Sequence, residues 1–248
     1  MSLPLVLLHG SFGCGDDWQP VVAALGREVV TPDLPGHGAR FQQPAESFAQ
    51  TVAEIVDRLP ERCDLCGYSM GGRLALAASI AAPPGRVRSL IIESAHPGLE
   101  EAARAARLSW DQDCSERLAR DPAAFLQTFY AAELFESFRA QPQFDEILAA
   151  RIARAERAPA QLAATFAALS LGNQPAMTEA LLTDQTPSLF VMGALDTKYA
   201  EIGRDLERRA AHARDLRFAM IADAGHNTHL EATSGFAAAA AAFWEDLS

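Results

Sequence analysis

Residues 67–72 read Gly67-Tyr68-Ser69-Met70-Gly71-Gly72, and this stretch decides the fold. The apolar run Leu65–Tyr68 predicts a buried strand, and Gly71–Ala82 has the spacing of a helix. A G-x-S-x-G pattern between a strand and a helix predicts a tight turn that pushes the serine hydroxyl above the sheet. The sequence therefore predicts Ser69 as a nucleophile, and a serine that only caps the helix is the alternative.

An acid and a histidine follow Ser69 in the chain order typical of this turn, serine then acid then histidine. Asp196 comes just after the predicted strand Ser188–Met192. His226 lies in the loop after the last predicted strand, Leu216–Ile221. We expect Asp196 to orient and stabilise the imidazole, and His226 to take the proton from Ser69.

Three other residues fit these two roles less well. Asp223 is too close to His226 in sequence to be its usual orienting acid, and Asp184 precedes its strand instead of following it. His212 falls in a predicted helix with charged neighbours, which is typical of a solvated surface. The predicted triad therefore keeps Asp196 and His226.

Backbone N–H groups are expected to form an oxyanion hole beside Ser69. His9-Gly10-Ser11-Phe12-Gly13 ends the predicted strand Leu3–Leu8, where a loop of this kind supplies one donor. The N–H groups of Ser11 and Met70 are the expected pair. A turn that only ends the strand is the alternative interpretation. The turn-rich segment Asp33–Gly38 is expected to be scaffold.

Strand and helix signals alternate along most of the chain. Strands are predicted at Leu3–Leu8, Glu28–Asp33, Leu65–Tyr68, Ser89–Glu93, Ser188–Met192 and Leu216–Ile221. Helices are predicted at Pro20–Leu25, Ala45–Leu59, Gly71–Ala82, Lys198–Ala211 and Phe236–Leu247. This alternation predicts an α/β fold with a mostly parallel sheet of about six strands flanked by helices.

Residues 99–175 interrupt the alternation, because they contain no strand signal. Asp121-Pro122 predicts the start of a helix, with the proline at its first position. Two further helices are predicted at Ile147–Arg157 and Gln161–Leu171. A helical insertion between parallel strands is typical of a lid. We therefore expect a cap at 99–175 inserted into an α/β core made of 1–98 and 176–248.

Composition and charge exclude several classes of function. Of 248 residues, 49% are hydrophobic and 21% charged, which is ordinary for a globular protein. No apolar run approaches the roughly 18 residues of a membrane span. The net charge of −11 disfavours nucleic acid and anionic membranes as partners, because both require a basic surface. A small anionic substrate remains compatible with this net charge if a few arginines converge on one pocket.

The cysteines and the N-terminal stretch indicate a cytoplasmic protein. Four cysteines are too sparse for a disulfide framework, and Cys63 and Cys66 have no second pair or histidine cluster to complete a zinc site. We expect buried, reduced thiols and no metal or cofactor. The first ten residues have no basic segment or small-residue cleavage site, so they predict a strand and not a signal peptide. A monomer is the default expectation.

Four further motifs give a narrower resemblance. Together they are similar to the MenH family of the α/β-hydrolase superfamily, and the superfamily resemblance covers nearly the whole chain. The motifs are Gly67–Arg73, Glu93–Leu99 with its H-P-G-L, Gly193–Tyr199 and Ala224–Glu231. The resemblance implies an α/β-hydrolase fold that lacks the usual first hairpin. MenH enzymes are 2-succinyl-6-hydroxy-2,4-cyclohexadiene-1-carboxylate synthases of menaquinone biosynthesis.

The resemblance implies a lyase that eliminates pyruvate from 2-succinyl-5-enolpyruvyl-6-hydroxy-3-cyclohexene-1-carboxylate. The triad would act as a base, the oxyanion hole would hold charge on the succinyl carbonyl, and no acyl-enzyme would form. The substrate carries several carboxylates, which arginine forks bind in bidentate fashion. Substrate-binding residues implied by the family are Tyr68, Arg73, Arg107, Arg154, Phe129 and Tyr130.

The assignment of the cap arginines leaves alternatives open. Arg151 or Arg157 can replace Arg154, because the register of this segment is uncertain, and Arg104 is a weaker candidate beside Arg107. Phe129-Tyr130 either line the pocket or belong to the core of the cap.

Two departures from the family pattern concern substrate choice. Ala194-Leu195 precede Asp196 where the family commonly has a charged pair, and Ala232 follows Glu231 where proline is frequent. A carboxylic-ester or carbon–carbon bond hydrolase that uses Ser69 as a true nucleophile is therefore the alternative function. A binding protein on a disabled hydrolase fold is a third reading, opposed by the complete triad.

Overall fold

The computed structural model describes residues 3–210 and 215–247, so the predicted surface histidine His212 lies outside the described residues. Within them, six strands form a sheet in the order β2-β1-β3-β4-β5-β6. The strands are β1 (Leu5–Leu8), β2 (Val29–Val30), β3 (Cys63–Tyr68), β4 (Val87–Glu93), β5 (Ser188–Gly193) and β6 (Leu216–Ile221). Each neighbouring pair is parallel, which confirms the predicted fold class.

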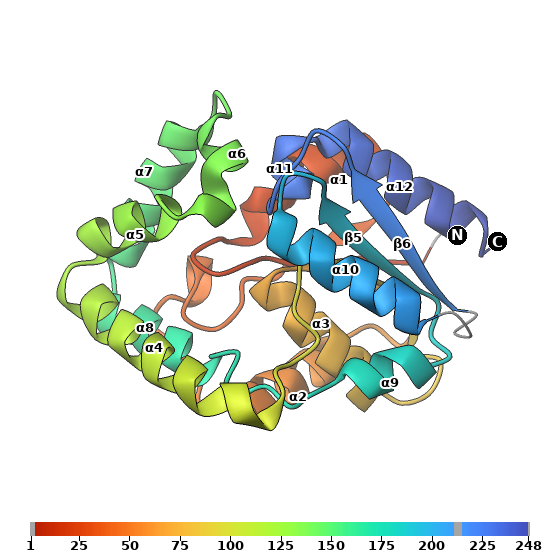
Figure 1. The fold of residues 1–248 in the computed structure, drawn as a ribbon, viewed down its shortest axis with the longest axis horizontal. Coiled ribbons are helices and arrows are strands. Elements are labelled where there is room, and N and C mark those ends of the chain that lie inside the picture. Colours follow the sequence, from red (N-terminus) through yellow and green to blue (C-terminus); the bar gives the residue numbers. More distant parts are fainter. Residues whose placement is uncertain (1–2, 211–214, 248) are drawn as a thin grey trace.

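Helices cover both faces of the sheet (Figure 1). One face packs against α2 (Phe48–Arg58), α3 (Met70–Ala81), α9 (Thr178–Thr183) and α10 (Thr197–Arg209). The other packs against η1 (Gly15–Trp18), α1 (Gln19–Leu25) and α12 (Thr233–Glu245), with the short α11 (Thr228–Glu231) beside them. A short η2 (Gly38–Arg40) follows β2. Burial on both faces explains why β1 and β5 read as continuous apolar runs, whereas the edge strands β2 and β6 are partly exposed.

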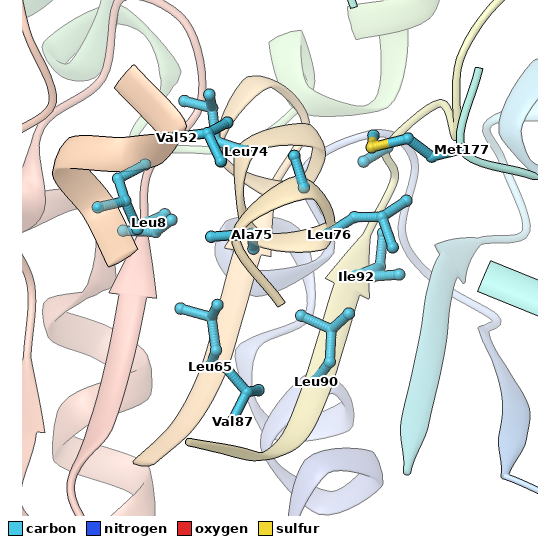
Figure 2. Close-up of a cluster of buried hydrophobic side chains, with 14 of the residues drawn as sticks. Leu8, Val52, Leu65, Leu74, Ala75, Leu76, Val87, Leu90, Ile92 and Met177 are labelled. Carbon is cyan, nitrogen blue, oxygen red and sulfur yellow. The ribbon is translucent and has the colours of Figure 1, made fainter. Parts of the chain in front are cut away.

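The packing of α3 on the sheet places Ser69 at the carboxyl ends of the strands. Figure 2 shows side chains from β1, β3 and β4 meeting those of α2 and α3. The residues labelled there on these elements are Leu8, Val52, Leu65, Leu74, Ala75, Leu76, Val87, Leu90 and Ile92. Each fully buried aliphatic side chain of this kind stabilises the fold by about 1.5–3 kcal/mol. Their sum fixes the strand-to-helix turn between β3 and α3.

The segment between β4 and α9, all of it described, is helical and contains no strand. Its elements are α4 (Glu101–Arg120), α5 (Pro122–Tyr130), η3 (Glu133–Phe135), α6 (Glu136–Arg139), α7 (Phe144–Ala155) and α8 (Pro159–Ala168). They gather at one side of the molecule, away from the two chain ends (Figure 1), and share an aromatic core of their own. We propose residues 99–175 as the cap.

The longest helix of the cap, α4, has no counterpart in the sequence-based prediction. Its 20 residues bury only Asp111, Cys114, Ser115 and Leu118, so no apolar stripe marks it as a helix. The other large cap helices begin and end near the predicted positions, with Pro122 and Pro159 in the first turn of α5 and α8.

The four cysteines are free and buried, as predicted. Burial raises the pKa of the Cys63 thiol to about 11, so it stays protonated at neutral pH. Within residues 3–210 and 215–247, no helix has the length and apolarity needed to cross a membrane.

Candidate active site

Ser69 occupies a strained turn at the end of β3. Its φ of 50° and ψ of −110° lie in a region that costs a non-glycine residue about 1–3 kcal/mol. Glycines make the turn compact: a Cβ on Gly67 would collide with the carbonyl of Gly71, and one on Gly71 with the carbonyl of Leu8. The G-x-S-x-G pattern therefore reflects close backbone packing that lifts Ser69 to the start of α3.

Ser69, His226 and Asp196 form a continuous line of hydrogen bonds. The Nε2 atom of His226 lies 3.2 Å from Ser69 Oγ, and its Nδ1 atom lies 2.7 Å from Asp196 Oδ2. The other carboxylate oxygen of Asp196 accepts the N–H of Tyr199 at 3.0 Å, at the start of α10. Asp196 and His226 are both buried. This arrangement can move a proton from Ser69 to His226 and stabilise the imidazolium.

The loop that carries His226 is held on both sides by one carboxylate. Glu231 Oε2 accepts the N–H of Gly225 at 2.8 Å, and Glu231 Oε1 accepts the N–H of Asn227 at 2.9 Å. Sequence reasoning did not find this role, because it depends on how the chain turns from β6 into α11. Glu231 thereby fixes the backbone on either side of His226.

The loop after β1 places Ser11 at the cavity, which Met70 also lines. Phe12 has a left-handed φ of 66°, and its N–H donates to His37 Nε2 at 3.1 Å. The N–H of Gly13 donates to the carbonyl of Gly10 at 3.2 Å. Among the described residues, no acceptor lies within hydrogen-bond distance of the Ser11 N–H. This leaves Ser11 able to donate to an oxyanion.

Two buried histidines support that loop in their neutral form. Burial, followed by the charge of His9, lowers the pKa of His37 to about 3. Its Nδ1 donates to the carbonyl of Pro35 at 2.8 Å, which leaves Nε2 free to accept from Phe12. Burial also lowers the pKa of His9, whose Nε2 accepts the N–H of Leu34 at 3.0 Å. The segment after β2 therefore supports the loop after β1.

A cavity of about 280 Å³ lies between Ser69 and the cap. Its wall on the cap side is largely aromatic, formed by Trp110, Phe125, Phe129, Tyr130, Phe135 and Phe166. Phe129 and Tyr130 are at the wall as the family resemblance implies, and Tyr68 lines it from the core. The other rings of the wall were not predicted from the sequence, because their positions depend on how the cap helices pack.

Four cations line the same cavity: Arg73, Arg107, Arg117 and Lys198. Arg73 and Arg107 are among the predicted substrate-binding residues. Arg117 and Lys198 are not, although Lys198 follows the predicted acid by two residues. A concentration of positive charge in one cavity contrasts with the net charge of −11 of the whole chain.

Arg73 is held by neutral oxygens only. Its guanidinium donates to the Leu169 carbonyl at 2.8 Å and to Gln174 Oε1 at 3.1 Å, both in the cap segment. In the described part of the chain, no carboxylate lies within ion-pair distance of it. Burial lowers the pKa of Arg73 to about 10, so the group remains charged at neutral pH. A half-buried cation without a counter-ion in the described chain favours an anionic ligand.

Arg107 and Lys198 extend this positive region. Arg107 Nε donates to Asp111 Oδ2 at 2.7 Å, which leaves its two terminal nitrogens free to turn to a ligand. Lys198 is exposed at the cavity, and burial of part of its side chain together with the charge of Arg107 lowers its pKa.

Arg154 does not line the cavity, and neither of its alternatives does. Arg154 approaches Asp17 of η1 at 4.0 Å, and Arg157 stacks on the Phe41 ring at 3.8 Å. Arg151 is buried and donates to Asp17 Oδ2 at 2.6 Å, so this face of α7 serves to join cap and core.

Arg151 touches the site only indirectly, through a hydrogen bond to the hydroxyl of Tyr130. Arg104 also misses the cavity and donates to the carbonyl of Gly172 at 3.0 Å. Across residues 3–210 and 215–247, no three side chains of the histidine, cysteine or acidic types gather as a metal site would require.

The sheet order, the serine turn after β3 and the acid and histidine after β5 and β6 define an α/β hydrolase. A family model described as "Alpha/beta hydrolase family" matches residues 5–239. The chain belongs to this family.

The curated relatives narrow the family further. The chain is 34% identical to the 2-succinyl-6-hydroxy-2,4-cyclohexadiene-1-carboxylate synthase of Serratia proteamaculans, over 94% of this chain and 90% of that one. It is 33% identical to the synthase of the same name from Pectobacterium atrosepticum, over 91% and 87% of the two chains. Within the alpha/beta hydrolases, the chain therefore groups with these synthases.

A solved structure agrees with this placement. The structure of MenH from S. aureus matches with a TM-score of 0.87 and 25% sequence identity, over 98% of this chain and 94% of that one.

Proposed function

We propose that this chain is a lyase that eliminates pyruvate from 2-succinyl-5-enolpyruvyl-6-hydroxy-3-cyclohexene-1-carboxylate. The product is 2-succinyl-6-hydroxy-2,4-cyclohexadiene-1-carboxylate, the compound for which the curated relatives are named. The observation that carries the proposal is Arg73, a half-buried cation without a carboxylate partner among the described residues, in the same cavity as Ser69 and His226.

The reaction begins with removal of a ring proton. The proton on C2 is acidic because the succinyl carbonyl is attached to that carbon. His226 takes the proton of Ser69 Oγ, and the serine oxygen removes the C2 proton. The electron pair forms the C2=C3 double bond, the C3=C4 pair moves to C4=C5, and the C5–O bond breaks. The departing enolpyruvate takes up a proton and becomes pyruvate.

The oxyanion hole stabilises the charge that develops in this step. Negative charge moves onto the succinyl carbonyl oxygen as the C2 proton leaves, and the N–H groups of Ser11 and Met70 donate to it. One donor of this kind is worth roughly 3 kcal/mol of activation free energy. The bond that breaks joins carbon to an ether oxygen, so no acyl group is transferred to Ser69.

The cations of the cavity explain why an anionic substrate is favoured. The substrate carries three carboxylates, on the ring, on the enolpyruvyl group and at the end of the succinyl arm. Each supplies the counter-ion that Arg73 and its neighbours lack within the described protein, and arginine binds carboxylates through two parallel hydrogen bonds. A neutral ester offers no such compensation.

The test is analysis of the products. The substrate is generated enzymatically in the same assay from isochorismate and 2-oxoglutarate. We expect the chain to produce pyruvate and the cyclohexadiene in equal amounts, faster than the uncatalysed elimination. The matched control is Ser69→Ala, which should fall to the uncatalysed rate. No acceleration, together with rapid Ser69-dependent hydrolysis of simple esters, would replace the lyase by a serine hydrolase on the same triad.

A further inference from the structure

Arg117 stands apart from the other cations of the cavity. Arg73, Arg107 and Lys198 form one group, close enough for the charge of Arg107 to act on the other two. Arg117 lies ten residues after Arg107 on α4, and a helix rises about 1.5 Å per residue, so the backbones are about 15 Å apart along the helix axis. The cavity therefore has a second positive end.

The side chain of Arg117 reaches the cavity next to the aromatic wall. Its Cζ atom lies 5.7 Å from the centroid of the Phe125 ring, and its Nη2 donates to Cys114 Sγ at 3.1 Å. The Phe125 ring in turn lies 5.9 Å from the ring of Phe12, in an edge-on contact. Phe12 follows Ser11 in the oxyanion loop. Phe125, which lines the cavity, therefore packs between the buried Phe12 ring and the Arg117 guanidinium.

Arg117 has no carboxylate partner among the described residues. Asp111, the acidic residue that lines the cavity, pairs with Arg107. Three cations of the cavity are therefore without a carboxylate in the described chain: Arg73, Lys198 and Arg117. The proposed substrate carries three carboxylates, so each of these cations has one anionic group to bind.

We propose that Arg117 forms a separate anion subsite, which binds the terminal carboxylate of the succinyl arm while the carbonyl of that arm lies in the oxyanion hole. The identity of the arm rests on the proposed function. Two methylene groups separate carbonyl from carboxylate, and three C–C bonds of about 1.5 Å place the two carbons about 4 Å apart. The methylene groups lie along Phe125, and the carboxylate reaches toward the guanidinium.

Two aromatic keto acids serve as test ligands that distinguish the arm carboxylate from the ring carboxylate. 4-Phenyl-4-oxobutanoate carries only the arm carboxylate, and 2-butanoylbenzoate carries only the ring carboxylate beside an arm of the same length. Binding of each to the whole chain is measured by titration calorimetry. We expect Arg117→Ala to weaken binding of 4-phenyl-4-oxobutanoate about tenfold, because a charge-assisted contact is lost. Binding of 2-butanoylbenzoate should change less than about twofold.

Two further variants keep the outcome clear. Arg120→Ala removes an exposed arginine of the same helix that does not line the cavity, and it should leave both affinities unchanged. Arg117→Lys should retain part of the affinity, because a point charge remains without the bidentate fork. Equal loss of both ligands, loss of neither, or an unmodified chain that does not bind 4-phenyl-4-oxobutanoate would overturn the subsite.

The calorimetric result is independent of turnover. One outcome is that the unmodified chain fails to accelerate pyruvate release while the Arg117→Ala variant binds 4-phenyl-4-oxobutanoate more weakly than the unmodified chain does. In that case the lyase proposal fails and the anion subsite stands. If pyruvate release is fast and Arg117→Ala changes neither affinity, the lyase stands and the subsite fails.

Discussion

The two sides of the cavity differ in how completely their polar groups are hydrogen-bonded within the described protein. On the sheet side, Ser69, His226 and Asp196 are linked to one another, the Tyr199 N–H holds Asp196, and the Glu231 carboxylate holds the loop of His226. On the cap side, α4 presents Arg107 and Arg117 among aromatic rings, and much of their hydrogen-bonding capacity has no partner in the described chain.

This difference separates two tasks. Groups whose hydrogen bonds are complete before a ligand arrives need no rearrangement to transfer a proton, which suits catalysis. Cations that lack counter-ions gain most from an anionic ligand, which suits selection of substrate. The sheet side is therefore expected to determine kcat on any substrate, and the cations to determine which substrate binds.

Loss of the base should give the largest effect. We expect His226→Ala to lower the rate of pyruvate release by about 10³- to 10⁴-fold, because Ser69 can no longer be deprotonated. The melting temperature should change little, since the imidazole bonds mainly within the triad. A variant that retains near-native turnover would contradict the assignment of the base.

Loss of the Asp17–Arg151 ion pair, which joins η1 of the core to α7 of the cap, should have the largest effect on stability. We expect Asp17→Ala to lower the free energy of unfolding by about 3 kcal/mol in urea titrations, because it leaves the buried Arg151 without its counter-ion. The double variant Asp17→Ala/Arg151→Met should recover part of this loss. A double variant as unstable as the sum of its single changes would show that the two residues do not interact.

Weakening the hydrogen bonds that hold the His226 loop should have a smaller effect, and only on kcat. We expect Glu231→Gln to lower kcat about tenfold with little change in KM, since one of the two N–H groups beside His226 loses its acceptor. Glu245→Gln, at the exposed end of α12, is the matched control. A rise in KM at constant kcat would show that Glu231 acts on substrate binding instead.

The neutral His37 beside the loop after β1 should make stability depend on pH. His37 has a pKa of about 3 in the folded protein, against about 6.5 when unfolded. The unfolded chain therefore binds one more proton between these values, and stability falls as pH falls below about 6.5.

Replacing His37 with glutamine tests this contribution. In urea titrations between pH 6 and pH 4, His37→Gln should reduce the pH dependence of the unfolding free energy by about 1.4 kcal/mol per pH unit. An unchanged slope would mean that His37 is protonated in the folded protein.

The sheet side could be predicted from the sequence because its signals are local. The Gly67–Gly72 stretch predicts a tight turn because it lies between an apolar strand and a helix, and Asp196 and His226 each follow a strand. Six parallel strands follow from the apolar runs and their alternation with helices. The carboxyl ends of parallel strands meet at one edge, so the topology brings these residues together.

The cap side could not be predicted in the same way. The helix α4 buries a polar face, so nothing in its periodicity marks it or shows which arginine turns inward. Arg154 and Arg151 look equivalent in sequence to Arg107, but in the structure both turn to Asp17 of η1. The inward residues of the cap depend on helix packing, which the sequence expresses weakly.

The most direct test of the division between the two sides is the effect of Arg73→Ala on two substrates. The measurement is the ratio of kcat/KM for pyruvate release to kcat/KM for hydrolysis of a neutral activated ester, in the unmodified chain and in the variant. We expect the ratio to fall about a hundredfold, because the carboxylate substrate loses its half-buried counter-ion while the triad stays intact. An unchanged ratio, with both activities reduced equally, would contradict the account and make Arg73 part of the support for the triad.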